Sequence, residues 1–248
     1  MQRIKCIISY DGSEFFGYQV QLSERTVQSE IERALKQMHR RQVRVTASGR
    51  TDAGVHALGQ VIHFDTDLKL PPDAWVRALN TMLPDDIAVR QAEVAPMEFH
   101  ARFGAFGKKY MYKIDLGKIR DPLKRNYAFH YPYALDIEKI REAARYLEGE
   151  HDFTSFSSAR SEVKDKVRTI YGIDFIQEGT ELTITYRGNG FLYNMVRILT
   201  GTLMEVGSGK REPHEMKEIL MKKDRAAAGK TAPPQGLYLC EVYYREEC

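Results

Sequence analysis

The first hundred residues alternate between short strand-like segments and two amphipathic helical stretches. Strands are predicted at residues 3–11, 43–47, 60–65 and 86–94, where apolar residues either alternate with polar ones or follow one another. Apolar positions recur at helical spacing after Thr26, which is placed to cap a helix, and again after Pro71. The predicted order is therefore β-α-β-β-α-β, which is typical of a ferredoxin-like, split-βαβ domain.

The second half of the chain repeats this order of elements without repeating the residues. Strand patterns occupy residues 109–116, 167–176, 181–187 and 238–243, and helical stripes follow Asp136 and cover residues 192–203. The small-residue stretch at 103–107 separates the halves. We therefore predict an α+β protein with two ferredoxin-like (RRM-like) antiparallel-sheet subdomains, residues 1–104 and 105–248, fused around a central cleft.

Composition narrows the class of protein only a little. Hydrophobic residues make up 43% of the chain and charged residues 29%, which is ordinary for a globular protein. No apolar run approaches about 20 residues and no charged leader precedes an apolar one, so we expect neither a membrane span nor secretion. The three cysteines are scattered, which favours reduced thiols in the cytoplasm over a disulfide framework or a zinc site.

The net charge of +3 is compatible with a nucleic-acid partner but does not indicate one. Basic residues in predicted loops and helix ends of the second half are each typical of a solvated surface. Together they could follow a phosphate backbone. They are Lys118, Arg120, Lys124, Arg125, Lys164, Lys166, Arg168, Lys222, Lys223, Arg225 and Lys230.

The segment SGRTDAGVHA, residues 48–57, holds one carboxylate among small residues and two basic ones. Asp52 follows a predicted strand, where an aspartate is most often a turn residue that accepts hydrogen bonds from nearby N–H groups. Its neighbours also suit a functional role, because Gly49 and Gly54 permit close approach of a ligand and Arg50 offers a charged fork. The residues alone leave both interpretations open.

Two further residues have an ordinary and a chemical interpretation. Arg197 lies beside the apolar stripe of the helix predicted over 192–203, either as a surface arginine with its stem on the core or as a buried partner for a carboxylate such as Asp52. Tyr110 shares a strand face with Tyr112 next to two lysines. It is either a core residue or a platform on which a base can stack.

Several motifs give the chain a close, nearly end-to-end resemblance to the tRNA pseudouridine synthase A (TruA) family. The most specific is GRTDAGVHA at 49–57, which is intact. Tyr18 is a departure, since many members carry tryptophan there. The other motifs are YDGSEFFGYQ (10–19), FHARF (99–103), KKYMYKI (108–114), HDFTSF (151–156), VRTI (167–170), GNGFLYNMVRILTG (188–201) and KTAPPQGLYL (230–239).

The resemblance implies the pseudouridine synthase fold and an enzyme that isomerises uridine at positions 38, 39 and 40 of the tRNA anticodon stem-loop, without cofactor or metal. It implies that Asp52 is the catalytic nucleophile, that Arg50 contacts RNA and holds the flipped base open, and that Tyr110 stacks on the target uracil. Arg197 would pair with Asp52. A homodimer that binds one tRNA through both subunits is also implied.

Two alternatives remain at this stage. One is a non-catalytic RNA-binding protein with exposed aromatic residues on two RRM-like sheets, which would have no use for an ionised carboxylate in a cleft. The other is a paralogue with the same chemistry on other uridines, whose catalytic segments would look identical. For His56, His100 and His151 we expect structural roles.

Overall fold

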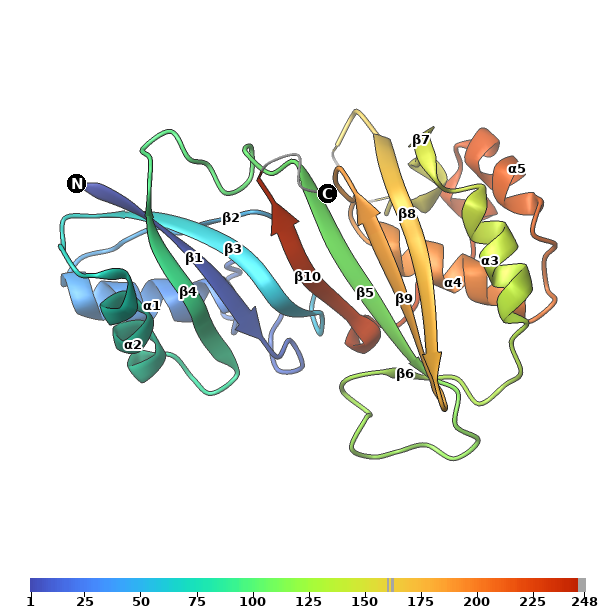
Figure 1. Ribbon diagram of the computed structural model, residues 1–248, viewed down its shortest axis with the longest axis horizontal. Coiled ribbons are helices and arrows are strands. Elements are labelled where there is room, and N and C mark those ends of the chain that lie inside the picture. Colours follow the sequence, from blue (N-terminus) through green and yellow to red (C-terminus); the bar gives the residue numbers. More distant parts are fainter. Residues whose placement is uncertain (160, 162, 245–248) are drawn as a thin grey trace. The chain divides into compact units, whose positions relative to one another are not determined.

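The computed structural model in Figure 1 describes residues 1–159, 161 and 163–244. Backbone contacts divide the chain into two units. The first unit comprises residues 1–106 together with the C-terminal stretch that begins at Tyr238, and the second comprises Gly107–Leu237. The division at 106–107 lies in the small-residue stretch between the predicted subdomains. The assignment of the C-terminal strand differs from the prediction, because that strand joins the sheet of the first unit.

The sheet of the first unit has an antiparallel core. The strand β1 (Gln2–Tyr10) lies between β3 (His56–Thr66) and β4 (Ile87–Ala95) and is antiparallel to both. The two-residue strand β2 (Thr46–Ala47) is antiparallel to β3. The C-terminal strand β10 (Leu237–Tyr243) runs parallel to the start of β3, where Tyr238 pairs with His56. Residues from both ends of the chain therefore share one sheet.

Two helices, α1 (Val27–His39) and α2 (Pro72–Met82), pack side by side against one face of this sheet (Figure 1). Alternate residues of β1 are buried, as a strand with one covered face requires: Ile4, Cys6, Ile8 and Tyr10. The predicted cap of α1 is present, because the Thr26 side chain accepts a hydrogen bond from the Ser29 N–H and the Ser29 side chain accepts one from the Thr26 N–H.

The strands of the second unit pair antiparallel to one another, in the order β5 (Gly107–Asp115), β9 (Glu181–Gly188), β8 (Val167–Glu178), β7 (Gly149–Asp152). A two-residue strand, β6 (Phe129–His130), pairs parallel to the end of β5. The helix α3 (Ile137–Arg145) packs against α4 (Met195–Gly207) and α5 (Glu215–Lys222) on one side of the sheet (Figure 1). Three short 3₁₀ segments, at 154–156, 225–227 and 234–236, complete the elements described.

The predicted α+β class is confirmed, and the first unit has the predicted β-α-β-β-α-β order. Two predicted boundaries differ. The strand expected at 43–47 pairs only at Thr46–Ala47, because the Val45 N–H donates instead to the Glu32 side chain at 3.2 Å. The helix expected from 192 begins at Met195, because Asn194 before it is left-handed, with φ of 61°.

Among the described residues, no helix combines the length and apolar character needed to span a membrane.

Candidate active site

The loop between β2 and β3, residues 48–55, carries Asp52 and Arg50. Asp52 is half-buried, whereas Arg50 is exposed. Thr51 between them is buried, and both its side chain and its backbone bind residues of the same unit. Its hydroxyl lies 2.7 Å from the Tyr10 hydroxyl, and its carbonyl oxygen accepts a hydrogen bond from the Tyr18 N–H at 3.0 Å. After Asp52, the Gly54 N–H donates to the Phe15 carbonyl oxygen at 3.3 Å, so the backbone is held on either side of Asp52.

The start of the loop is tied to β3 by a second set of hydrogen bonds. The Ser48 N–H donates to the Val61 carbonyl oxygen at 2.8 Å, and the Ser48 hydroxyl donates to the Gln60 Oε1 at 2.6 Å. The Gln60 Nε2 in turn donates to the Gly49 carbonyl oxygen at 2.9 Å. Burial raises the pKa of Tyr10 to about 12, so the hydroxyl that contacts Thr51 stays protonated at neutral pH.

Two glycines allow residues 11–18 to pack tightly against this loop. A Cβ at Gly12 would lie 2.1 Å from the Val55 carbonyl oxygen, and one at Gly17 would lie 2.8 Å from that of Thr51. Gly17 also has a φ of +90°, which side chains rarely allow. The YDGSEFFGYQ segment therefore supports the Asp52 loop, which gives a physical reason for the co-occurrence of the two motifs.

His56 has a structural role, as predicted from the residue alone. It is buried, and its Nδ1 accepts a hydrogen bond from the Gly12 N–H at 3.0 Å. Its ring stacks on Tyr238, with ring centroids 4.7 Å apart. The residue joins the Asp52 loop to the strand β10 at the other end of the chain.

Tyr110 lies on β5 in the second unit, and its ring packs edge-on against Phe191, with centroids 5.2 Å apart. Phe191 follows Gly188, where a Cβ would lie 3.3 Å from the Phe191 ring and 2.7 Å from the Thr169 carbonyl oxygen. Gly188 therefore makes room for the ring that packs against Tyr110. Nothing in the residue pattern alone pointed to Phe191.

Arg197 projects from the first turn of α4 and is held by two acceptors of its own unit. Its Nε donates to the Ala232 carbonyl oxygen at 2.8 Å, and its Nη1 donates to the Asn194 Oδ1 at 2.9 Å. The Ala232 N–H donates back to the Arg197 carbonyl oxygen at 3.0 Å. Burial raises the pKa of Tyr112, and the positive charge of Arg197 opposes that rise, which places the guanidinium near Tyr112 on β5.

The segment 230–236 therefore helps to position a predicted site residue. It reaches α4 closely because a Cβ at Gly201 would lie only 1.8 Å from the Lys230 carbonyl oxygen. Its far end is tied to β5, where the Tyr112 hydroxyl donates to the Pro233 carbonyl oxygen at 2.7 Å. The motif KTAPPQG was the sequence signal for this segment, but the pattern gave it no role.

The predicted site residues thus fall into two groups. Arg50 and Asp52 share one loop of the first unit, whereas Tyr110 on β5 and Arg197 on α4 both belong to the second. Among the described residues, no group of three or more His, Cys, Asp and Glu side chains is arranged to hold a metal ion.

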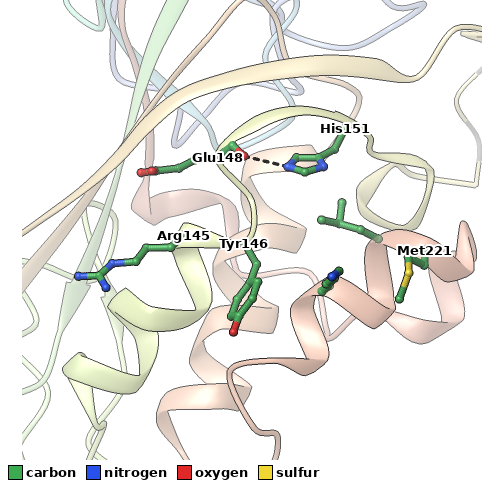
Figure 2. Close-up of a pocket in the computed structure, with 7 residues that line it drawn as sticks. Arg145, Tyr146, Glu148, His151 and Met221 are labelled. Carbon is green, nitrogen blue, oxygen red and sulfur yellow. Dashed lines mark hydrogen bonds between the residues drawn. The ribbon is translucent and has the colours of Figure 1, made fainter.

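A surface pocket of about 390 Å³ in the second unit contains none of the predicted site residues. It lies between α3, β7 and α5 and is lined by residues that include Arg145, Tyr146, Glu148, His151 and Met221 (Figure 2). His151 donates from Nε2 to the Glu148 carbonyl oxygen at 2.8 Å, which gives it a structural role at the start of β7.

Comparison with known proteins gives matches along nearly the whole chain. A family model described as tRNA pseudouridine synthase matches residues 6–104 and 143–245. The tRNA pseudouridine synthase A of Geobacillus sp. (strain WCH70) is 58% identical over 244 residues, which cover 98% of each chain. That of Listeria innocua is 58% identical over 247 residues, covering 98% of this chain and 100% of the relative.

Two solved structures are also similar. A chain of the archaeal box H/ACA sRNP Nop10-Cbf5 complex is 13% identical with a TM-score of 0.38, and the match covers 90% of this chain and 59% of that one. For the Cbf5-Nop10-Gar1 complex the identity is 12%, the TM-score 0.34 and the coverage 96% and 56%.

The family model spans most of the chain and includes both the Asp52 loop and α4. Relatives that are more than half identical extend over almost every residue. This chain therefore belongs to the tRNA pseudouridine synthase family, enzymes that isomerise uridine to pseudouridine in tRNA.

Proposed function

We propose that this chain acts on uridines 38, 39 and 40 of the tRNA anticodon stem-loop, as a homodimer in the cytoplasm, with Asp52 as its nucleophile. The assignment of Asp52 is supported by the way its loop is held. Backbone and side-chain contacts of Ser48, Thr51 and Gly54 fix a half-buried carboxylate in one place. A group that must meet one ribose carbon needs such preorganisation.

The reaction breaks the N1–C1′ glycosidic bond and forms a C5–C1′ bond after the base has turned. The hydrogen on C5 leaves as a proton and N1 gains one, so the reaction consumes no other reactant. A carboxylate beside the ribose can attack as a nucleophile, remove a ribose proton as a base, or stabilise positive charge at C1′. Each of these routes requires Asp52 to be ionised, and we propose the first.

Arg50 and Tyr110 are proposed to handle the base. A uracil stacked in an RNA helix is out of reach, so it must leave the stack before it can react. Tyr110, whose ring packs edge-on against Phe191, would offset part of the lost stacking by lying against the flipped uracil. Arg50, exposed on the Asp52 loop, would occupy the space that the base has left.

Arg197 is proposed to pair with Asp52 and keep its carboxylate ionised. Two of its guanidinium nitrogens are already oriented by the Ala232 carbonyl oxygen and the Asn194 side chain. A guanidinium held in this way loses little conformational entropy when it pairs with a carboxylate.

The assignment of Asp52 is tested by replacing it with asparagine, which keeps the size of the side chain and removes the charge. We expect the D52N variant to bind undermodified tRNA nearly as well as the natural protein but to release no tritium from C5-labelled uridine, a loss of at least about 10³-fold. The control is D73N, at an exposed aspartate in the first turn of α2. Residual turnover in D52N within tenfold of the control would remove Asp52 from the mechanism.

The target positions need a separate experiment. RNA from cells that lack this protein is expected to lose pseudouridine at tRNA positions 38 to 40 and nowhere else. If those positions keep pseudouridine and other uridines lose it, the chemistry assigned to Asp52 stands and the assigned positions are wrong.

A further inference from the structure

An exposed loop of the second unit displays apolar side chains that a folded domain normally covers. The loop, residues 118–127, follows β5 and is called the basic loop below. The Ile119 residue is 86% exposed, Leu123 is 81% exposed and Tyr127 is 45% exposed. Several exposed apolar side chains on one short loop are a feature of surfaces that bind a partner.

The base of the basic loop is well anchored. Asp115, at the end of β5 and only 3% exposed, accepts hydrogen bonds on its Oδ1 from the Gly117 N–H and the Thr180 hydroxyl, both at 3.2 Å. On the returning side, His130 donates from Nε2 to the Gly117 carbonyl oxygen at 2.8 Å. Both ends of the loop are therefore held close together at the sheet.

The tip of the loop is also shaped by its own hydrogen bonds. The Leu123 N–H donates to the Asp121 Oδ1 at 2.9 Å, and the Lys124 N–H donates to the Asp121 carbonyl oxygen at 3.1 Å. The Arg125 Nη1 donates to the Pro122 carbonyl oxygen at 2.8 Å. Asp121 is the only acidic residue of the loop, and this turn uses its carboxylate.

Four basic residues belong to the same loop. Lys118, Arg120 and Arg125 are exposed, and the Lys124 Nζ lies 4.0 Å from Asp115. The loop therefore presents a surplus of positive charge around Ile119 and Leu123. This combination of charged and apolar side chains fits RNA, which offers negatively charged phosphates together with the apolar faces of its bases.

We propose that the basic loop is a second contact surface for tRNA, separate from the residues that handle the target uracil. Lys118, Arg120 and Arg125 bind phosphates, and Ile119 and Leu123 lie against ribose or base faces. The proposal rests on tRNA being the substrate. Direct contact of this loop with the same loop of a second copy fits less well, because it would bring the two sets of basic side chains together.

The basic loop follows the end of β5 (Figure 1), the strand that also carries Tyr110. Tyr110 and Asp115 are both on β5, and five residues of extended strand span about 17 Å. The loop begins beyond Asp115, so it lies farther from Tyr110 than a single nucleotide reaches. It therefore contacts nucleotides away from the one that is flipped, and contributes to tRNA affinity rather than to the chemical step.

The test compares two variants of the whole chain in binding to full-length undermodified tRNA at several salt concentrations. One replaces Lys118, Arg120 and Arg125 by glutamine, and the other replaces Ile119 and Leu123 by serine. We expect the first to weaken binding at least tenfold and to lower the slope of log K against log salt by about 2. The second should weaken binding several-fold and leave the slope unchanged.

A matched control removes the same charge elsewhere, by replacing the exposed Lys36, Arg40 and Arg44 of the first unit by glutamine. Its salt slope should stay close to that of the natural protein. The single-turnover rate at saturating tRNA should be unchanged in both loop variants, which separates this proposal from the D52N test. Natural affinity and slope in the glutamine variant, or a change of oligomeric state with natural tRNA binding, would overturn the proposal.

Discussion

Two tyrosines beneath the Asp52 loop, Tyr10 and Tyr18, are both buried, and their ring centroids lie 6.5 Å apart. The Tyr10 hydroxyl contacts the Thr51 hydroxyl, whereas the Tyr18 hydroxyl has no hydrogen-bond partner among the residues that the structure describes. Burial without a partner raises the pKa of Tyr18 well above its usual value and penalises the hydroxyl even when neutral.

Replacing Tyr18 by phenylalanine is therefore expected to raise the free energy of unfolding by about 1 kcal/mol, because the variant buries no unsatisfied hydroxyl. The matched variant Y10F removes a hydroxyl that is hydrogen-bonded to Thr51 and should lower the free energy of unfolding by about 1 kcal/mol. Urea unfolding followed by circular dichroism measures both. Destabilisation of similar size in the two variants would mean that the Tyr18 hydroxyl has a partner after all.

At the residue scale, the sequence identified candidate side chains but not the backbone conformations that hold them. The motif around Asp52 and the resemblance identified Arg50, Tyr110 and Arg197, whose proposed roles remain predictions. Asn194 was not identified, because its role depends on a left-handed backbone that lets its amide reach Arg197. Asparagine adopts that conformation more readily than most residues, but nothing in the pattern required it here.

At the scale of elements, α4 and the segment 230–236 pack closely against each other. The carbonyl oxygens of Lys230 and Ala232 approach α4 at Gly201 and Arg197, respectively. The first contact is possible only with glycine, and the second orients the guanidinium. A change at Gly201 should therefore reach Arg197 through the segment that both contact.

We expect the G201A variant to lose at least about tenfold in kcat. Its Cβ would meet the Lys230 carbonyl oxygen at 1.8 Å, so the segment must move and Arg197 loses the acceptor at Ala232. The control is G207A in the same helix, where the new Cβ meets the flexible end of Ile140 at 2.5 Å rather than backbone. Both variants replace glycine by a better helix former, so a kcat loss of equal size in both would assign the effect to the helix itself.

Elements were predicted best where one face is buried and the ends carry caps. Helix α1, with its Thr26 cap, and helix α3, whose Asp136 side chain accepts from the Lys139 N–H, follow the pattern closely. Strand β7 was missed because its sequence, GEHD, has no apolar alternation and its pairing is provided by β8. Such a strand forms because of its tertiary neighbours, and the local pattern of apolar residues does not reveal those neighbours.

At the scale of the whole molecule, the first unit depends on the last strand of the chain. The sequence predicted β10 as a strand but placed it in the second subdomain, because order along the chain does not reveal which sheet a terminal strand joins. Its parallel pairing with β3 brings Tyr238 onto His56, beside the Asp52 loop. The integrity of the Asp52 loop should therefore depend on residues far along the chain.

Gly59 allows this pairing, because a Cβ there would lie 2.3 Å from the Cys240 carbonyl oxygen. The G59A variant should push β10 away from β3 and lower the free energy of unfolding by about 2 kcal/mol. Amide hydrogen exchange should then accelerate in residues 237–243, while the β8–β9 pair of the second unit keeps its protection. The neighbouring variant L58A, at a half-exposed side chain, should leave the exchange in 237–243 unchanged. Natural protection of 237–243 in G59A would show that the β3–β10 pairing does not need the glycine.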